Sequence, residues 1–261
     1  MRHIAPYRTP RIGVDLKELT LGAAIVLTAR PFTTYEANQG ACLAAIVERH
    51  EDRDGQVTDL RLWTVQERHA VISHYLAHTF DSFDFPVGEN ARFSNYLLME
   101  RPMAEPVALG PIADDEWTLL PLLGLYAESI ERLMAQQRIP GKRHGWVIAC
   151  MAAQMRSTEA RESEFLAKCN LPNAPHQDLP EALVDDWLER RVQMLLNTAE
   201  SDFADLMGAY LAGFEQQQHL VRMAHHDDGL VLVGEAPGLP PARFPVSDLF
   251  GRQTQRLLGL A

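Results

Sequence analysis

An apolar stripe in the last third of the chain constrains the fold more than any other feature of the sequence. Residues three and four positions apart share one face of an α-helix, so apolar residues at this spacing predict an amphipathic helix. The spacing continues without interruption through Val184, Leu188, Val192, Leu195, Ala199, Phe203, Leu206, Tyr210 and Phe214.

The stripe favours one long helix over two shorter ones. Asp178 can cap the first turn of this helix and Pro180 can occupy that turn. The stripe crosses "NTAESDF", where Ser201 could begin a second helix, yet its phase is kept. A helix of about forty residues would be about 60 Å long, which suits packing along a partner chain or in a long bundle. The alternative is two helices packed in one core.

The other patterns are shorter. Ile12, Val14 and Leu16 alternate with polar or small residues, which predicts a half-buried strand. Thr20 is a suitable N-cap for a following helix. The segment 81–117 is rich in Pro, Gly and Asp, which predicts an irregular region. Short helices are expected within 21–30, 33–50, 65–80, 119–137, 145–156 and 247–260, and a second short strand at 230–233.

These patterns together predict a mainly α protein with a few short β-strands and a long amphipathic helix in the C-terminal third. We expect two domains. Residues 1–156 would form an α-rich N-terminal domain with short strands, and residues 157–261 a long-helix region with a C-terminal strand and a small helix. With 261 residues and 46% apolar content, the chain can bury a substantial core.

The segment "LRLWTVQERHAVISHYLAHTF", residues 60–80, carries the most suggestive chemistry. Thr64 is followed three residues later by Glu67, and this capping-box pattern predicts a helix that starts at Val65. Counting helical turns from Val65 places His69 at the margin of the apolar side. We therefore expect His69 to be a hydrogen-bonded histidine at the edge of the core.

Glu67, His74 and His78 fall together on the opposite side of the same helix, which we expect to be exposed. Histidines four residues apart can bind one metal ion, and Glu67 lies two turns earlier on that side. The catalytic zinc motif, however, needs a glutamate directly after its first histidine, and Tyr75 stands there. The pair therefore indicates a solvated or partner-facing surface, and the alternative is a metal-dependent hydrolase that uses His74 and His78.

The loop "HEDRDGQVTD" fails the test for a calcium site. If its glycine is the sixth loop position, His50 is first and Arg61 is twelfth, where the motif needs an acidic ligand and a bidentate glutamate. A polar turn at Asp52–Gly55 is expected instead. The chain also lacks GxSxG, HExxH, GxGxxG and Walker A patterns. We therefore predict no catalytic, cofactor-binding or metal-binding residues.

Other carboxylate and histidine clusters are expected to be structural. Each carboxylate pair precedes an apolar segment, where acidic residues favour a helix start or a surface position. The cluster that contains histidines has the composition of a polar turn. These clusters are Asp114 with Asp115, Asp185 with Asp186, and His225 and His226 with Asp227 and Asp228.

The net charge of the chain indicates which class of partner it can bind. The chain has 24 basic and 35 acidic residues, a net charge of −11 and a pI near 5.3. This charge opposes binding to nucleic acid and to anionic lipid surfaces, so we expect a protein partner.

The cysteines and the longest apolar run favour a protein that stays inside the cell. Cys42, Cys150 and Cys169 are far apart and form no CxxC motif, which favours a reducing environment. The run Leu19–Ala29 is too short to span a bilayer. We therefore expect a soluble protein that is not exported.

Several phrases of the sequence resemble tail-assembly and baseplate-assembly proteins of tailed bacteriophages. "ELTLGAAIVLT" followed by "LRLWTVQERHAVISHYLA" is similar to the opening of such proteins. "FSNYL", "LGPIADDEWTLLPLLGLYAESIERL" and "GWVIACMAAQM" resemble proteins of the tail gene clusters of Mu-like and related phages. The resemblance covers about Arg11 to Arg156.

The resemblance implies a non-enzymatic role in tail or baseplate morphogenesis, either as a virion component or as an assembly chaperone. The partners would be other tail or baseplate proteins, and a homo-oligomer is compatible with this role. The protein would be located in the virion tail or baseplate, or in the host cytoplasm during assembly. We expect the Val184–Phe214 stripe to be the main interaction surface. A regulatory module that recognises a host protein is a third alternative.

Overall fold

The computed structural model describes residues 3–52, 59–79, 84, 86–87, 91–98, 101–112, 115–157, 180–234, 236 and 238–257. The chain folds into two compact units. The first unit comprises Met1–Met103, His219–Ala224 and Val231–Ala261, and the second comprises Ala104–Gln218 and His225–Leu230. The predicted domain boundary at residue 156 therefore falls inside the second unit.

The predicted fold class is wrong, because the protein is a mixture of helices and small antiparallel sheets. It contains eight α-helices, is 52% helical and has 21% of its residues in strands, as far as the structure describes the chain. None of the described helices has both the length and the apolar character needed to cross a membrane.

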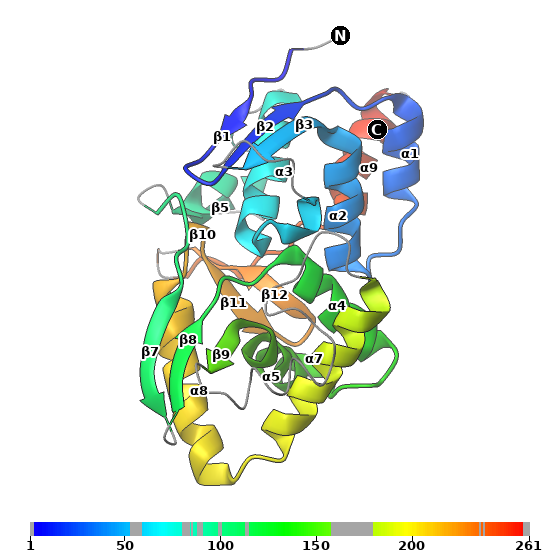
Figure 1. Ribbon diagram of the computed structural model, residues 1–261. Coiled ribbons are helices and arrows are strands. Elements are labelled where there is room, and N and C mark those ends of the chain that lie inside the picture. The colour runs from blue at the N-terminus through cyan, green and yellow to red at the C-terminus, as the bar shows by residue number, and fades with distance from the viewer. Residues whose placement is uncertain are drawn as a thin grey trace. The chain divides into compact units, whose positions relative to one another are not determined.

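The first unit combines a small sheet with helices (Figure 1). The sheet has the order β1-β2-β3 and is antiparallel throughout. Its core lies between this sheet and helices α2 and α3, with Val14, Leu43 and Val71 fully buried. Its elements are β1 (Tyr7–Arg8), β2 (Ile12–Leu16), α1 (Leu21–Thr28), α2 (Tyr35–Ile46), β3 (Val47–Asp52), η1 (Leu60–Leu62), α3 (Val65–Thr79), β4 (Pro86–Val87), β5 (Ala91–Arg92), η2 (Phe93–Tyr96), β6 (Leu97–Leu98), β10 (Leu220–Val221) and α9 (Val246–Leu257).

Two local predictions for the first unit are confirmed. Ile12, Val14 and Leu16 are buried on one face of β2, as their alternation predicts. Thr20 caps α1, because its hydroxyl oxygen accepts a hydrogen bond from the backbone N–H of Ala23 at 3.2 Å. Short-range patterns therefore identify these elements correctly.

Among its described residues, the second unit contains a three-stranded antiparallel sheet of order β7-β8-β9 and four helices. Helix α7 packs against α4 and α5, and α8 packs against β7 and β8. The hairpin of β11 (Met223–His226) and β12 (Gly229–Leu232) contributes its turn to this unit. The remaining elements are β7 (Val107–Ile112), β8 (Asp115–Leu119), α4 (Gly124–Ala135), α5 (Lys142–Gln154), β9 (Met155–Ser157), α7 (Glu181–Leu196) and α8 (Glu200–Gln216).

Strands β7 and β8 lie where the sequence predicts an irregular segment. The Gly110–Pro111 pair within β7 has the sequence pattern of a loop. Gly110 has φ of +81° at the point where the register with β8 shifts, so it forms a bulge that glycine accommodates readily. Pro111 pairs with Glu116 in an edge strand, where a missing backbone N–H costs no ladder hydrogen bond.

The predicted long helix is also wrong, and the alternative of two helices is correct. Helix α7 ends at Leu196, and α8 begins at Glu200 after an extended residue, Ala199. Asn197 Nδ2 donates to the carbonyl of Gln193 at 2.7 Å, and the Thr198 hydroxyl donates to the carbonyl of Met194 at 3.1 Å. These side chains satisfy carbonyls of the last turn and so favour a helix end. The chain then turns back at the bottom of Figure 1.

The apolar stripe is core instead of an interaction surface. Val184, Leu188 and Val192 are at most 2% exposed, and they face the core of the second unit from α7. Leu206 and Tyr210, on α8, are at most 5% exposed. Leu195 and Phe203 are half-buried and Ala199 is exposed, where α7 ends and α8 begins. Most of the stripe is therefore core, and we do not assign it as the main docking surface.

The tight start of α5 gives a first prediction. A Cβ atom on Gly145 would lie 1.8 Å from the carbonyl oxygen of Pro140, which is backbone and cannot rotate away. We expect Gly145→Ala to lower the free energy of unfolding by about 3 kcal/mol, measured by urea denaturation. Gly208→Ala is the control, because a Cβ there meets no atom within 4 Å. That change should be neutral or stabilising by up to about 1 kcal/mol. Equal losses in both variants would contradict the described packing.

Candidate functional site

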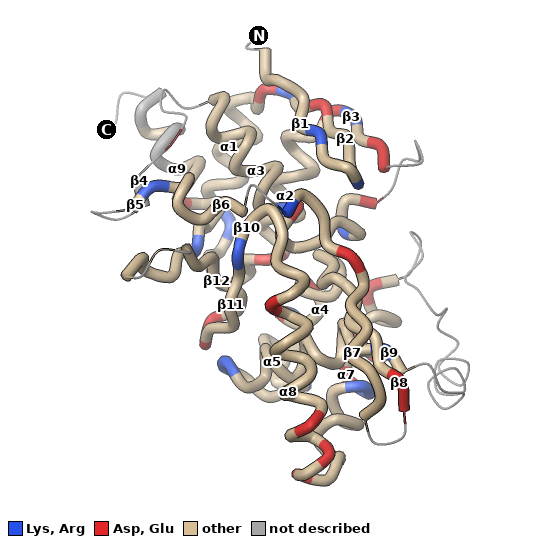
Figure 2. Tube along the Cα trace, turned by 90° about the vertical axis from the view of Figure 1, so that its left-hand side faces the viewer, with Lys and Arg blue, Asp and Glu red and all other residues tan. Residues whose placement is uncertain are grey.

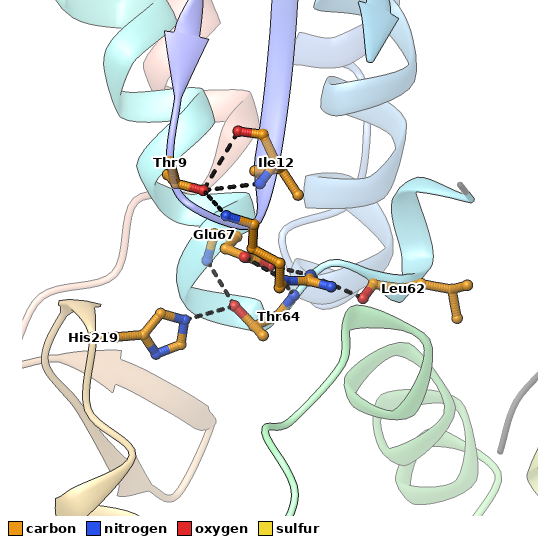
Figure 3. A network of polar contacts seen from close by, with 7 residues as sticks. Thr9, Ile12, Leu62, Thr64, Glu67 and His219 are labelled. Carbon is orange, nitrogen blue, oxygen red and sulfur yellow. Dashed lines mark hydrogen bonds and ion pairs between the residues drawn. The ribbon is translucent and has the colours of Figure 1, made fainter. Parts of the chain in front are cut away.

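The capping box predicted at the start of α3 is present. The backbone N–H of Glu67 donates to the hydroxyl oxygen of Thr64 at 3.1 Å, and the backbone N–H of Thr64 donates to Glu67 Oε2 at 2.8 Å. Figure 3 shows this exchange at the centre of a larger network of polar contacts. The helix start is therefore fixed by two reciprocal hydrogen bonds.

Glu67 is buried by an ion pair, which corrects the expectation that it lies on an exposed face. Arg11 Nε donates to Glu67 Oε1 at 2.6 Å, and Arg11 Nη2 forms an ion pair with Oε2. The turn between β1 and β2 positions Arg11, since Thr9 Oγ1 accepts from the N–H groups of Arg11 and Ile12 (Figure 3). The Glu67 side chain is only 1% exposed. The sequence pattern around Glu67 could not reveal this burial, because its partner Arg11 lies far from Glu67 in the sequence.

His219 joins the same network. Its Nε2 lies 2.9 Å from the hydroxyl oxygen of Thr64 (Figure 3). The same oxygen accepts a hydrogen bond from the Glu67 N–H, so Thr64 contacts both the helix start and His219. Thr64 and His219 are 3% and 1% exposed. The Thr64 hydroxyl is engaged by the Glu67 N–H and by His219 Nε2, so we assign the pair a structural role.

His74 and His78 lie next to one another but are held by backbone groups. His74 Nε2 is 2.8 Å from the carbonyl oxygen of Ala5, and His78 Nδ1 is 2.9 Å from the carbonyl oxygen of His74. Burial lowers the pKa of His74, the Ala5 carbonyl opposes this shift, and the neighbouring His78 adds to it. Both rings are half-buried, and their centroids are 4.2 Å apart.

The metal-dependent alternative gains no support from this geometry. Glu67 is engaged by Arg11, so it does not join His74 and His78 as a ligand. Within the described part of the chain, no group of three or more His, Cys, Asp or Glu side chains is arranged to bind a metal ion.

A second polar cluster lies around Tyr35 in the first unit. Helix α2 contributes Tyr35 and Gln39, α3 contributes His69, and the segment before α9 contributes Arg243. The ring centroids of Tyr35 and His69 are 5.8 Å apart. The guanidinium carbon of Arg243 lies 4.0 Å from the centroid of the Tyr35 ring on its face, a cation–π arrangement. We refer to Tyr35, Gln39, His69 and Arg243 as the Tyr35 cluster.

Burial determines the protonation of the histidine in this cluster, and neighbouring charges add to its effect. Burial lowers the pKa of His69 to about 3, with smaller contributions from the positive charges of Arg68 and Arg243. His69 is therefore neutral at pH 7. His69 is buried, as predicted. The prediction that it is fully hydrogen-bonded is wrong for one atom, since Nε2 has no hydrogen-bond partner among the described residues.

The second unit has a buried polar network of its own. The Tyr210 hydroxyl donates to Gln154 Oε1 at 3.2 Å and lies 3.0 Å from His225 Nε2. Gln154 Nε2 in turn donates to the carbonyl of Leu120 at 2.9 Å. Burial, followed by the charge of Arg143, lowers the pKa of His225 to about 4. This network ties α5, α8 and the β11–β12 hairpin together.

The remaining clusters named from the sequence have structural roles where they are described. Asp227 and Asp228 form the turn of the β11–β12 hairpin, as predicted, and His226 lies beside them. Asp185 is buried, contrary to expectation, where it accepts hydrogen bonds from Ser129 and Arg132. Asp186 forms an ion pair with Arg138 at 2.7 Å. Asp114, Asp178, Cys169 and residues 53–58, which include most of the predicted turn, lie outside the described residues.

An apolar surface on and after α1 was not expected as a functional feature. Leu21, Ile25, Val26 and Phe32 are 45%, 46%, 63% and 73% exposed, and we call these four residues the α1 face. The opposite side of α1 packs against α9 (Figure 1). Figure 2 shows that α1 carries no charged residue along its length. The available signal was that "LGAAIVLT" is apolar on every side, although only one side can face its own core.

No family model, curated protein or solved structure matches this chain.

Proposed function

We propose that this protein is a non-enzymatic tail or baseplate morphogenesis protein of a phage, and that it binds other tail proteins through the α1 face. The exposure of Leu21, Ile25, Val26 and Phe32 is the observation that carries this proposal. Four large apolar side chains exposed within a dozen residues are typical of a protein–protein interaction site.

Two further observations support the proposal. The α1 face belongs to "ELTLGAAIVLT", the first of the phrases that resemble phage tail proteins. The chain has a net charge of −11, whereas α1 itself is uncharged. A partner with an apolar groove bordered by basic residues would match both properties, since complementary charge speeds association and opposes wrong partners.

The proposal is tested by affinity capture of the tagged full-length protein from infected cells, followed by mass spectrometry. We expect at least one identified tail or baseplate protein of the phage to be captured. Capture of host proteins alone would support the regulatory alternative and contradict the proposal.

Mass spectrometry of purified particles then distinguishes the two versions of the function. A virion component is present at a fixed copy number in the tail or baseplate. An assembly chaperone is absent from particles and is found only in the host cytoplasm during assembly.

A further inference from the structure

The Tyr35 cluster contains buried polar atoms that its own protein neighbours do not satisfy. Gln39 Oε1, His69 Nε2, and Nε and Nη2 of Arg243 are buried and have no hydrogen-bond partner among the described residues. Gln39 and His69 are 1% and 3% exposed. Buried polar atoms without partners are costly, so they normally bind water or a ligand.

The two Arg243 atoms form a specific binding geometry. Nε and Nη2 lie on one edge of the planar guanidinium, and this edge can donate two parallel hydrogen bonds to the two oxygens of a carboxylate. A phosphate can accept in the same way. The edge is therefore chemically suited to a planar or tetrahedral oxyanion.

The surrounding residues hold Arg243 in place. The backbone N–H of the adjacent Phe244 donates to the Tyr35 hydroxyl at 3.3 Å, and Gln39 Nε2 donates to the Phe244 carbonyl at 3.5 Å. The Phe244 ring packs edge-on against Phe93 and Tyr96. The backbone and the ring of Phe244 are therefore both held by neighbouring residues. Because the guanidinium of Arg243 also stacks on Tyr35, Arg243 is preorganised for binding.

Charge around the cluster favours an anion. Arg68 and Arg243 contribute two positive charges, Glu36 contributes one negative charge, and His69 is neutral at pH 7. Two positive charges and one negative charge leave a net charge of +1 in a mostly buried region. One bound anion would neutralise it.

We propose that the Tyr35 cluster binds a small carboxylate that also carries a hydroxyl or amino group. The carboxylate binds the Nε–Nη2 edge of Arg243, and the hydroxyl or amino group donates to Gln39 Oε1. This assignment uses three of the four atoms that lack partners, whereas a plain oxyanion would also leave Gln39 Oε1 unsatisfied. We assign a free small molecule as the ligand, because Gln39 and His69 are almost completely buried.

The inference is tested by thermal unfolding of the full-length protein in glycolate, acetate, phosphate or chloride at equal ionic strength and pH 7.5. We expect Tm to rise with the logarithm of the glycolate concentration, more than with acetate or phosphate, while chloride has no comparable effect. A largest effect from phosphate would overturn the carboxylate assignment, and equal effects of glycolate and acetate would overturn the role of Gln39. Equal effects of all four anions would overturn the site.

Variants assign the effect to Arg243. Arg243→Lys keeps the charge but lacks the two-donor edge, so we expect at least a tenfold weaker apparent affinity for glycolate. Arg49→Gln is the matched control, because Arg49 is in the same unit and its side chain is 73% exposed. An unchanged glycolate response in Arg243→Lys would contradict the inference.

A second measurement keeps the test independent of the variant's stability. In the wild-type protein, titration with glycolate should shift one arginine Nε–H resonance in a ¹H–¹⁵N NMR spectrum, and this resonance should be absent in Arg243→Lys. If the shifted resonance persists in the variant, or if none shifts, the atoms are satisfied by water and the inference fails.

Discussion

Replacing Glu67 with alanine is expected to lower the free energy of unfolding by about 4 kcal/mol. The carboxylate is almost completely buried, accepts from Arg11, and also accepts the backbone N–H of Thr64 in the capping box. The substitution leaves Arg11 without its carboxylate and removes one capping interaction, which alone contributes about 1 kcal/mol. Urea denaturation at pH 7 measures the loss.

Glu67→Gln and a double-mutant cycle separate these contributions. The glutamine can still accept from the Thr64 N–H, so we expect a smaller loss than with alanine. The cycle with Arg11→Ala should show a coupling above about 1 kcal/mol, because the partners form direct charged hydrogen bonds. The exposed pair Arg49–Glu51, at 3.5 Å, is the control, and Glu51→Gln should cost less than about 1 kcal/mol. Similar losses for Glu67→Gln and Glu51→Gln would contradict the account.

Acid is expected to destabilise each unit through one buried histidine. The folded pKa values of about 3 for His69 and about 4 for His225 lie below the ordinary value of 6.5. Between these values the unfolded chain binds more protons than the folded one. Stability is therefore fully present above pH 6.5 and falls as the pH decreases, by about 1.4 kcal/mol per pH unit for each histidine. From pH 7.5 to 4.5 each unit should lose about 2.5 kcal/mol from this source.

Histidine variants separate this effect from the titration of carboxylates. Relative to wild type, His225→Asn should become more stable by about 2.5 kcal/mol as the pH falls from 7.5 to 4.5, whatever its stability at neutral pH. His69→Gln should show the same trend in the first unit. His226→Gln removes an exposed histidine of the same hairpin, with 52% of its side chain exposed, and serves as the control. A pH dependence in His225→Asn that parallels wild type would show that His225 is not buried in its neutral form.

Features that depend on neighbouring residues could be predicted from the sequence. The alternation in β2, the Thr20 cap and the Thr64–Glu67 capping box are all decided within a few residues, and the structure confirms each. The helix break at Asn197 was foreseeable in principle. Asn197 and Thr198 are residue types whose side chains hydrogen-bond to backbone carbonyls and so favour a helix end. The unbroken spacing of the apolar stripe favours the opposite interpretation, a continuous helix.

Features that depend on distant residues could not be predicted in this way. The sequence predicts an exposed Glu67, because its partner Arg11 lies on a different element. The Tyr35 cluster includes Arg243, which contacts Tyr35 although the residues of the second unit lie between them in the sequence. Strand β7 was missed because its Gly-Pro pair indicates a loop unless the edge position and the bulge are known. The stripe has the spacing of a surface helix, but only tertiary packing decides what covers it.

The central claim is that the α1 face binds a tail protein, and the affinity of the captured tail protein for a Val26→Glu/Phe32→Glu variant tests it most directly. Two charged residues in the centre of an apolar interface should raise the Kd at least about 30-fold, which corresponds to about 2 kcal/mol. Leu211→Glu is the control, because Leu211 is 50% exposed on α8, outside the α1 face. We predict wild-type affinity for this control, and equal affinities of the α1-face variant and wild type would contradict the account.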